Sequence, residues 1–352
     1  MMYQLILKEG QVVLVQQVNN KNMNKFDFND ILIRPAKTSY IESRQNINPF
    51  QDGFLPLITA PMDTVVNHVN NSLYTMKGIR TCTPRGEKNS LGFTSFSLNE
   101  IEELLIGDKL NPYGFYLIDI ANGHMKKLRT ITKEIKTKYP KITLMVGNIA
   151  NPETYKLLSE AGADYIRVGI GNGGGCSTTV HTGVGYPMGS LISECYMISC
   201  YIDNPAKIVA DGGMQNYSDI IKALALGADY VMVGNIFNKA IESCGDNYLW
   251  KFIKVPQSIA EIAYDLKIPV YKKFRGMSTK AVQKKWGKKT LTTSEGVTRY
   301  QRVEYTLSQW VNNFEDYLRS AMSYSNTTRL ADFIGYADTI KITENAYKRF
   351  KK

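Results

Sequence analysis

Long apolar runs are the first thing that this sequence lacks, since none approaches the roughly 18 residues that a membrane-spanning helix needs. Histidine and cysteine are also scarce, with three and five residues respectively among 352. The cysteines include no CxxC pair, which argues against a zinc site or a disulfide scaffold and favours reduced thiols in a cytoplasm. His124 and His181 show no ligand spacing, so we expect no transition metal. The opening stretch MMYQLILKEGQ has no basic lead and no small-residue cleavage site, so we expect no signal peptide.

Acidic residues are in the minority, with 32 against 43 basic ones and a formal charge of +11. The basic residues concentrate in YKKFRGMSTKAVQKKWGKK and in the final YKRFKK. No nucleic-acid-binding motif accompanies them, so we expect no nucleic-acid partner. Two interpretations stay open: a solvated basic surface, or attraction of small molecules that carry phosphate.

The apolar pattern predicts a barrel. The first residues read as a hairpin, YQLILK, a turn, and VVLVQQ, followed by a polar connector. Short apolar strands then alternate with amphipathic helices, and eight strand candidates lie between Pro56 and Gly234. The segments AGADYIRVGI and LGADYVMVGN repeat one another. Eight such units predict an α/β fold, a (β/α)8 TIM barrel, in which functional groups gather where strands end and loops begin.

The most unusual of these strand ends is VGIGNGGGCSTTVHTGVGYP, Val168 to Pro187, in which five glycines precede a cysteine. Glycine clusters allow a backbone to approach a ligand closely. Cys176 would then be a thiolate nucleophile near the hydroxyl of Thr178. The alternative, equally weighted on this stretch alone, is a small buried hydrophobic residue.

Other strand ends carry polar residues. Asp211, Gly212 and Gly213 form ADGG, and Gly234 lies in VGN; an acid can bind sugar hydroxyls and glycine amides can bind phosphate. Tight turns are the alternative. Asp119, Asn122 and Asn148 follow further strands, as does Asp63, which we interpret as a helix cap. Residues 290–300, TLTTSEGVTRY, read as a polar loop, with Glu295 as an acid or base on a closing flap or as a solvated acid.

The order of the motifs DILIRP, MDTV, IDIANGH, VGIGxGxxCxT, TGVGYP, ADGG, VMVGN, RGMS and SEG resembles that of the inosine monophosphate dehydrogenase / guanosine monophosphate reductase family, from about Phe26 to Ile342. TGVGYP, DILIRP, DIANG and GMS look like the reductase, and the flap lacks the Arg-Tyr pair of the dehydrogenase upstream of EG. APMDT and IRVGIG lean towards the dehydrogenase. The resemblance implies a TIM barrel, usually a homotetramer.

Reductive deamination of GMP, or of a related nucleotide such as dGMP, by NADPH is the reaction that the resemblance implies. Cys176, Thr178, Glu295 and Asp119 match the family's catalytic residues. The residues that match substrate-binding positions are Met62, Asn148, Asp211, Gly212, Gly213, Gly234, Asn235, Arg275, Gly276, Met277 and Ser278. Asp119, Ser95 and Asn122 match cofactor positions, and the backbone carbonyls of Gly171, Gly173 and Cys176 match a monovalent cation site.

The sequence departs from the family where the substrate phosphate is bound. Gly174 stands for a serine and Phe274 for a tyrosine, so two phosphate-binding hydroxyls are missing. We expect compensation from Asn235 or from the basic residues Lys272, Lys273 and Arg275. The segment CTPRGEKNSLG is too short for a full second helix, and Arg85 replaces or displaces the family's lysine there.

We divide the chain into residues 1–25, a hairpin and connector, and residues 26–352, a single barrel. The barrel includes a flap at about 275–305 and C-terminal helices, and no CBS regulatory domain interrupts it. Two other functions stay open. One is an IMP dehydrogenase that uses NAD, and the other is a purine-nucleotide-binding barrel without catalytic activity.

Overall fold

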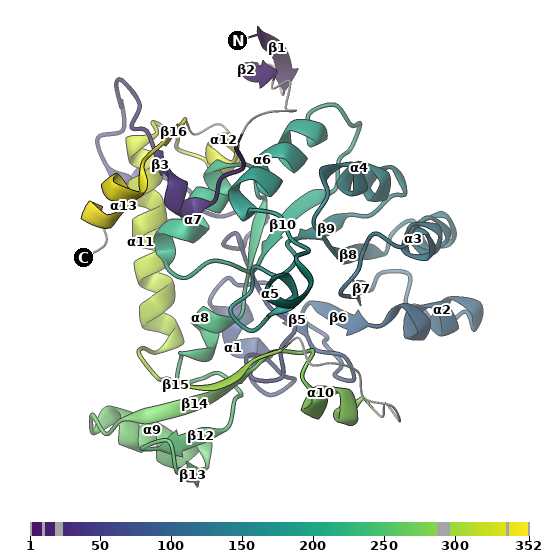
Figure 1. The fold of residues 1–352 in the computed structure, drawn as a ribbon, viewed down its shortest axis with the longest axis vertical. Coiled ribbons are helices and arrows are strands. Elements are labelled where there is room, and N and C mark those ends of the chain that lie inside the picture. Colours follow the sequence, from purple (N-terminus) through teal and green to yellow (C-terminus); the bar gives the residue numbers. More distant parts are fainter. Residues whose placement is uncertain (1, 9–10, 18–23, 287–295, 336–337, 351–352) are drawn as a thin grey trace.

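The computed structural model describes residues 2–8, 11–17, 24–286, 296–335 and 338–350. Eight parallel strands run in the order β4-β11-β10-β9-β8-β7-β6-β5 (Figure 1). Their bounds are Leu57–Thr59 (β4), Cys82–Thr83 (β5), Phe93–Phe96 (β6), Phe115–Asp119 (β7), Thr143–Ile149 (β8), Tyr165–Val168 (β9), Lys207–Asp211 (β10) and Tyr230–Val233 (β11). Arg80, just before β5, closes the ring: it accepts from the Thr59 amide at 3.0 Å and donates to the Leu57 carbonyl at 3.1 Å. The predicted (β/α)8 barrel is confirmed.

Helices follow the strands with one exception. They are Asn71–Met76 (α1), Leu98–Ile106 (α2), Lys126–Lys138 (α3), Pro152–Glu160 (α4), Thr178–Thr182 (α5), Met188–Ser199 (α6), Tyr217–Ala225 (α7) and Asn235–Asn238 (α8). Helices α2, α4 and α7 begin with a capping side chain, and at α2 Ser97 and Glu100 form a capping box. Residues 84–92, between β5 and β6, form no helix, as the short CTPRGEKNSLG segment predicts.

The internal repeat corresponds to two equivalent helix–strand units, α4–β9 and α7–β11. Both helices are followed by a glycine with positive φ, +95° at Gly162 and +113° at Gly227. At Gly227 the position is also crowded, because an added Cβ would lie 2.3 Å from the ring of Tyr196. Glycine therefore lets each chain turn directly from the helix into a buried strand.

The barrel interior is a packed core. Tyr165 forms ring contacts with Phe93 at 5.4 Å and with Tyr230 at 5.8 Å between centroids, and all three side chains are buried. Cys82 lies in the same cluster, where burial raises the pKa of its thiol to about 12. This thiol therefore stays protonated at neutral pH, which leaves it a poor nucleophile.

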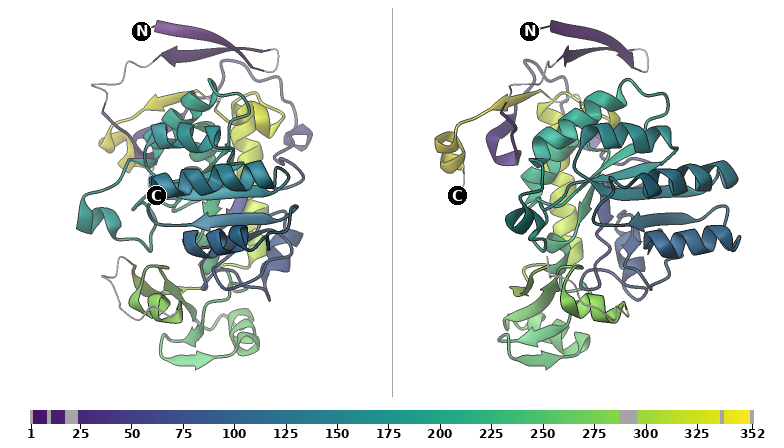
Figure 2. Two further views of the ribbon diagram at one scale, coloured as in Figure 1. Left: turned by 90° about the vertical axis from the view of Figure 1, so that its right-hand side faces the viewer. Right: turned by 45° about the vertical axis from the view of Figure 1, so that its right-hand side comes forward.

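A second, smaller sheet follows the barrel strands. Its strands are Asn247–Leu249 (β12), Ile253–Val255 (β13), Val270–Arg275 (β14) and Thr298–Arg302 (β15). They pair antiparallel in the order β13-β12-β14-β15. Helices Gln257–Asp265 (α9) and Lys280–Lys285 (α10) accompany the sheet, which is green in Figure 2. The expectation of a polar loop over 290–300 is wrong for residues 298–300, because pairing with β14 makes them a strand. Residues 287–295 lie outside the described part of the chain.

The ends of the barrel chain meet. After the helices Leu307–Tyr324 (α11) and Leu330–Phe333 (α12), strand Thr339–Lys341 (β16) pairs antiparallel with Ile31–Ile33 (β3), and helix Glu344–Phe350 (α13) follows (Figure 1). The predicted N-terminal hairpin is also present, with Met2–Lys8 (β1) paired to Gln11–Gln17 (β2). Among the described helices, none combines the length and the hydropathy that crossing a bilayer requires.

Lys272 gives the small sheet a predicted pH dependence. Its side chain is buried in β14 and donates to the Ser243 carbonyl at 2.5 Å and to Gln257 Oε1 at 3.3 Å. Burial lowers its pKa to about 8 from 10.5. Between these two values the unfolded chain binds more protons than the folded one, so the free energy of unfolding should rise with pH.

We therefore expect the wild-type protein to gain stability relative to Lys272→Met as the pH rises from 7.5 to 10, by up to about 3 kcal/mol from a shift of this size. Urea unfolding at several pH values measures the difference in free energy of unfolding between the two proteins. Tyrosines that titrate in this pH range contribute equally to both proteins, so their contribution cancels in the difference. A constant difference across this range would contradict the prediction.

Candidate active site

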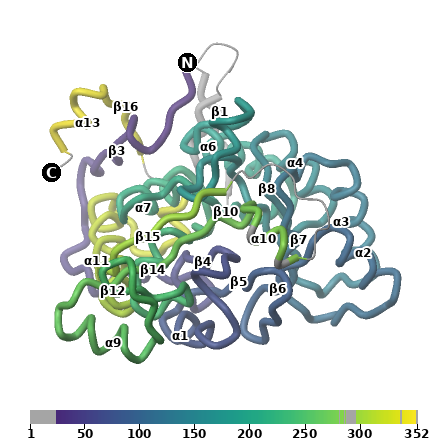
Figure 3. Tube along the Cα trace, turned by 60° about the horizontal axis from the view of Figure 1, so that its bottom comes forward, coloured from purple at the N-terminus to yellow at the C-terminus, as the bar shows by residue number. Residues whose placement is uncertain are grey.

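A cavity of about 520 Å³ opens at the carboxyl ends of the barrel strands. Residues at the carboxyl ends of β4, β5, β7, β8, β9, β10 and β11 line it, together with residues from Phe274 onward. Figure 3 shows β14 and β15 running beside the barrel strands β4 and β10. The predicted site residues that line it are Met62, Asp119, Asn148, Gly173, Cys176, Asp211, Gly212, Gly213, Gly234, Asn235, Gly276, Met277 and Ser278. Predicted site residues from seven separate segments of the chain are thus brought to one hollow, at the face where barrels carry their chemistry.

The thiol of Cys176 lies in this cavity, half-buried, 3.1 Å from the hydroxyl oxygen of Thr178. A tight turn precedes it, in which the Cys176 amide donates to the Gly173 carbonyl at 2.9 Å. Val297, the residue before β15, holds the loop in place, because its amide donates to the Gly175 carbonyl at 3.1 Å. The thiol is thus exposed to a ligand on one side and fixed on the other.

Close packing requires glycine at two positions before Cys176 and at one position of the ADGG turn. An added Cβ at Gly171, whose φ is +81°, would lie 1.7 Å from Thr179 Oγ1, and one at Gly175 would lie 2.9 Å from the Phe274 ring. Gly212, at φ +92°, leaves only 2.8 Å between an added Cβ and the Gly173 amide nitrogen. The cysteine loop and the ADGG turn therefore pack backbone to backbone, and only glycine fits.

Two carboxylates face the cavity and share one arginine. Arg167 on β9 donates from Nη1 to Asp119 Oδ1 and from Nη2 to Asp211 Oδ2, both at 2.7 Å. Asn148 Nδ2 also donates to Asp211 Oδ2, at 2.7 Å. Burial lowers the pKa of Arg167, but the two carboxylates raise it more strongly, so its guanidinium stays charged. Arg85 approaches Asp119 from the other side, with Nε 3.4 Å from Oδ2.

Comparison with known proteins agrees with this arrangement. The sequence profile described as "IMP dehydrogenase / GMP reductase domain" matches residues 113–351, more than half of the chain. The chain belongs to this family. GMP reductase 1 of Homo sapiens is 28% identical over 349 residues, covering 91% of this chain and 96% of its own. GMP reductase of Ascaris suum is 26% identical (93% and 95% covered), and GMP reductase 2 of Homo sapiens is 28% identical (93% and 97% covered). The protein is thus a GMP reductase-like member of an oxidoreductase family.

Arg275 is the clearest departure from the site expected of an IMP dehydrogenase / GMP reductase family member. Its guanidinium pairs with the Asp63 carboxylate, whose side chain is only 6% exposed, and it does not line the cavity. Asp63 is correspondingly no helix cap, since Asn70 precedes α1. The two residues that the sequence assigned separately, one to substrate and one to a cap, neutralise each other.

Ser95 and Asn122 also lie outside the lining of the cavity. Ser95 is buried in the barrel and donates to the Thr83 carbonyl at 2.6 Å. Asn122 is exposed, and its side-chain oxygen accepts from the His124 amide at 3.1 Å. These contacts explain both residues locally, and their cofactor role stays a prediction. Glu295 lies outside the described residues.

Metal ligation finds little support in the described part of the chain. No group of three or more His, Cys, Asp or Glu side chains that could hold a metal occurs there. His124 instead contacts the Thr154 hydroxyl at 2.8 Å and accepts from the Ala150 amide at 3.1 Å. The monovalent cation at the carbonyls of Gly171, Gly173 and Cys176 stays a prediction, with the Gly173 carbonyl already bonded to the Cys176 amide.

Three residues that sequence reasoning did not place in the site contribute to it. Arg167, Gln283 and Trp286 line the cavity, and the Arg85 guanidinium lies 4.5 Å from the Trp286 ring centroid. Arg167 left a signal in the internal repeat, where it aligns with the buried Met232. An arginine in one repeat, at a position where the other repeat has a buried methionine, indicates that the arginine has a specific partner.

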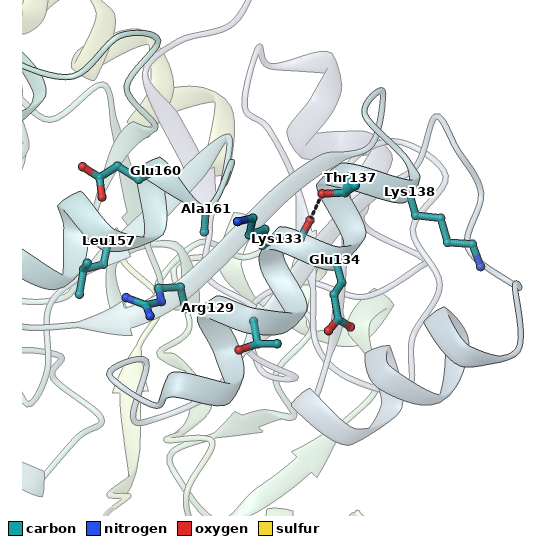
Figure 4. A pocket seen from close by; sticks show the side chains of 9 residues that line it. Arg129, Lys133, Glu134, Thr137, Lys138, Leu157, Glu160 and Ala161 are labelled. Atoms are coloured by element: carbon teal, nitrogen blue, oxygen red, sulfur yellow. Dashed lines mark hydrogen bonds between the residues drawn. The ribbon is translucent and has the colours of Figure 1, made fainter.

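Another hollow, of about 620 Å³, lies on the outside of the barrel between α3 and α4 (Figure 4). Its lining includes three basic residues of α3, Arg129, Lys133 and Lys138, and Glu160, the last residue of α4. No strand end and none of the predicted site residues borders this groove. We therefore assign the chemistry to the cavity around Cys176.

Proposed function

We propose that this protein reduces GMP, or a related purine nucleotide such as dGMP, to the corresponding inosine nucleotide and ammonia, with NADPH as the reductant. The position of Cys176 is the main support for this proposal. Its thiol lies in the cavity, 3.1 Å from the Thr178 hydroxyl, and the acids Asp119 and Asp211 also line the cavity. Similarity to GMP reductases over more than nine tenths of the chain supports the choice of substrate.

The proposed reaction begins with a covalent step, which the position of Cys176 supports. The Cys176 thiolate adds to C2 of the purine, the exocyclic amine leaves C2 as ammonia, and a thioimidate joins Sγ to C2. Thr178, beside the thiol, and Glu295 would deliver the proton that the leaving amine takes. When C2 has received a hydride, the C2–S bond breaks and the thiolate is released.

NADPH, when bound, supplies that hydride. The lining of the cavity also includes Asp119, Ala121, Gln283 and Trp286, which supply a carboxylate and an aromatic surface. A flat ring fits such a surface, and the cationic Arg85 beside it suits the cofactor's phosphates. Asp119 and Trp286 are therefore the residues that we assign to cofactor binding.

The ribose of the nucleotide belongs at Asp211. Its carboxylate is held by Arg167 and Asn148 and borders the cavity next to Gly212 and Gly213. A carboxylate whose position is fixed by two donors still has acceptor capacity for sugar hydroxyls.

Two incubations, one with GMP or dGMP and NADPH and one with IMP and NAD, test the proposal and separate the alternatives. GMP or dGMP is mixed with protein and NADPH, the loss of reduced-cofactor absorbance is followed, and the purine product is identified by chromatography. IMP or dIMP with an equal amount of ammonia is the expected result. Formation of XMP from IMP and NAD instead would indicate a dehydrogenase, and nucleotide binding without either reaction would indicate a non-catalytic barrel.

We expect Glu295→Gln to slow GMP turnover at least about 100-fold and to change GMP affinity little, since general acid–base groups contribute on this scale. Stopped-flow detection of ammonia and calorimetric titration with GMP measure the two effects. Glu344→Gln, on α13, serves as the matched control. Equal turnover by wild-type and Glu295→Gln protein would assign Glu295 to the solvated surface.

A further inference from the structure

The phosphate end of the cavity is recognisable although two expected hydroxyls are missing. Gly212, Gly213 and Gly234 follow β10 and β11, the seventh and eighth barrel strands in chain order, and line the cavity. Phosphate groups recur at these two strand ends in barrels. Gly174, Phe274 and Asn235 complete this end of the lining, and neither Gly174 nor Phe274 carries a hydrogen-bonding side chain.

The basic residues expected to compensate are either engaged elsewhere or placed on the opposite face of β14. Lys272 is buried and donates to Ser243 and Gln257 within the small sheet. Arg275 pairs with Asp63. Lys273 follows a buried Lys272 and precedes a buried Phe274, so strand alternation places its side chain on the face of β14 opposite to Phe274.

Arg299 is on the correct face. It lies directly across from Phe274 in the β14–β15 pair, so the two side chains share one face of the sheet. The Arg299 guanidinium lies 5.1 Å from the Phe274 ring centroid, and its Nη2 donates to Asn235 Oδ1 at 2.7 Å. An added Cβ at Gly174 would lie 3.2 Å from that same Nη2.

Three lining residues of the phosphate end therefore surround this one guanidinium. In the part of the chain that the structure describes, no carboxylate forms an ion pair with Arg299, whereas Arg275 and Arg167 are both paired. A guanidinium has five N–H donors, so one bond to Asn235 leaves others for an anion.

We propose that Arg299, positioned by Asn235 and by the Phe274 ring, binds the 5′-phosphate of the substrate in place of the missing hydroxyls. The assignment rests on the proposed function, because it takes the ligand to be a nucleoside monophosphate. It also accounts for both departures at once. Gly174 leaves the space that the guanidinium needs, and Phe274 provides an aromatic face on which a cation stacks.

The test compares a nucleotide with its nucleoside. Binding of GMP and of guanosine is measured by calorimetry for the wild type, Arg299→Ala, Arg299→Lys and Arg302→Ala. We expect Arg299→Ala to weaken GMP about 10- to 100-fold, the range for a charge-assisted bond, and to leave guanosine unchanged. Arg299→Lys should lose less of the affinity for GMP than Arg299→Ala does. Arg302 lies on the same strand but alternates to the opposite face, so Arg302→Ala should change neither ligand.

A rescue variant makes the test specific to this geometry. Gly174→Ser should leave GMP affinity unchanged or weaken it in the wild type, where the guanidinium occupies the space, and should restore part of it in Arg299→Ala. Thermal unfolding checks that each variant is folded.

Two outcomes overturn the assignment, and they are distinguishable. If Arg299→Ala changes GMP and guanosine equally, or neither, while the wild type still reduces GMP, only the role of Arg299 is wrong. If the wild-type protein binds no purine monophosphate, the proposed function fails and the phosphate assignment fails with it.

Discussion

Replacement of Cys176 by alanine should reduce GMP turnover by at least about a thousandfold, because removing a catalytic nucleophile leaves only the contribution of binding and orientation. GMP affinity should stay within about threefold of the wild-type value. The residues expected to hold ribose and phosphate, Asp211, Gly212 and Gly213 among them, do not depend on the sulfur atom. Turnover is measured with saturating NADPH and GMP affinity by calorimetry.

Cys200→Ala is the matched control, since Cys200 is half-buried at the end of α6 and does not line the cavity. It should retain normal turnover. Mass spectrometry of protein quenched during GMP turnover should find an adduct on the peptide that contains Cys176, and no adduct in Cys176→Ala. Turnover of Cys176→Ala near the wild-type rate would disprove covalent catalysis at this residue.

Replacement of Arg167 by methionine should damage both stability and turnover. It leaves Asp119 and Asp211 without the guanidinium that both contact at 2.7 Å. Removing one partner of a buried ion pair typically costs about 3–5 kcal/mol, and we expect the free energy of unfolding to fall by an amount in this range. We expect turnover to fall at least about 100-fold, because small displacements of reacting groups cost this much.

Turnover of folded protein separates a positioning role of Arg167 from a purely structural one. A positioning role predicts that Arg167→Met loses turnover even where circular dichroism shows that the variant is folded. Arg167→Lys keeps the charge but cannot bridge two carboxylates, and should lie between wild type and Arg167→Met. Arg129→Met, on the outer groove of Figure 4, controls for loss of a positive charge. Normal turnover by folded Arg167→Met would show that Arg167 is a replaceable core residue.

Much of the fold could be predicted because parallel barrel strands are buried on both faces. Such strands are short apolar runs that end in small or polar residues, and DYIRVGIG, KIVADGG and DYVMVGN all have this form. The missing second helix could also be predicted, since too few residues separate Thr83 from Phe93. The same rule places strand-end residues together, which is why so many predicted site residues line one cavity.

The small sheet could not be predicted in this way. Strand β15, TRYQR, is polar and exposed, and it is a strand only because β14 pairs with it. The sequence also does not show which side chain each arginine contacts. Arg275 and Arg299 look alike as basic residues near Phe274, yet one meets Asp63 and the other meets Asn235. That difference decides which of them is free to meet a phosphate, and it arises from the direction of each side chain on its strand.

The pairing of β3 with β16 has a consequence for synthesis of the chain. Ile31 meets Lys341 and Ile33 meets Thr339, and the Ile342 amide donates to the Asp30 carbonyl at 2.8 Å. These contacts join residues about 300 positions apart, and contacts of such separation are slow to form because a long loop must close first. During translation, residues 30–33 emerge about 300 residues before their strand partner. Strand β3 therefore stays without this partner until residues 339–342 have left the ribosome, after all eight barrel strands have been synthesised.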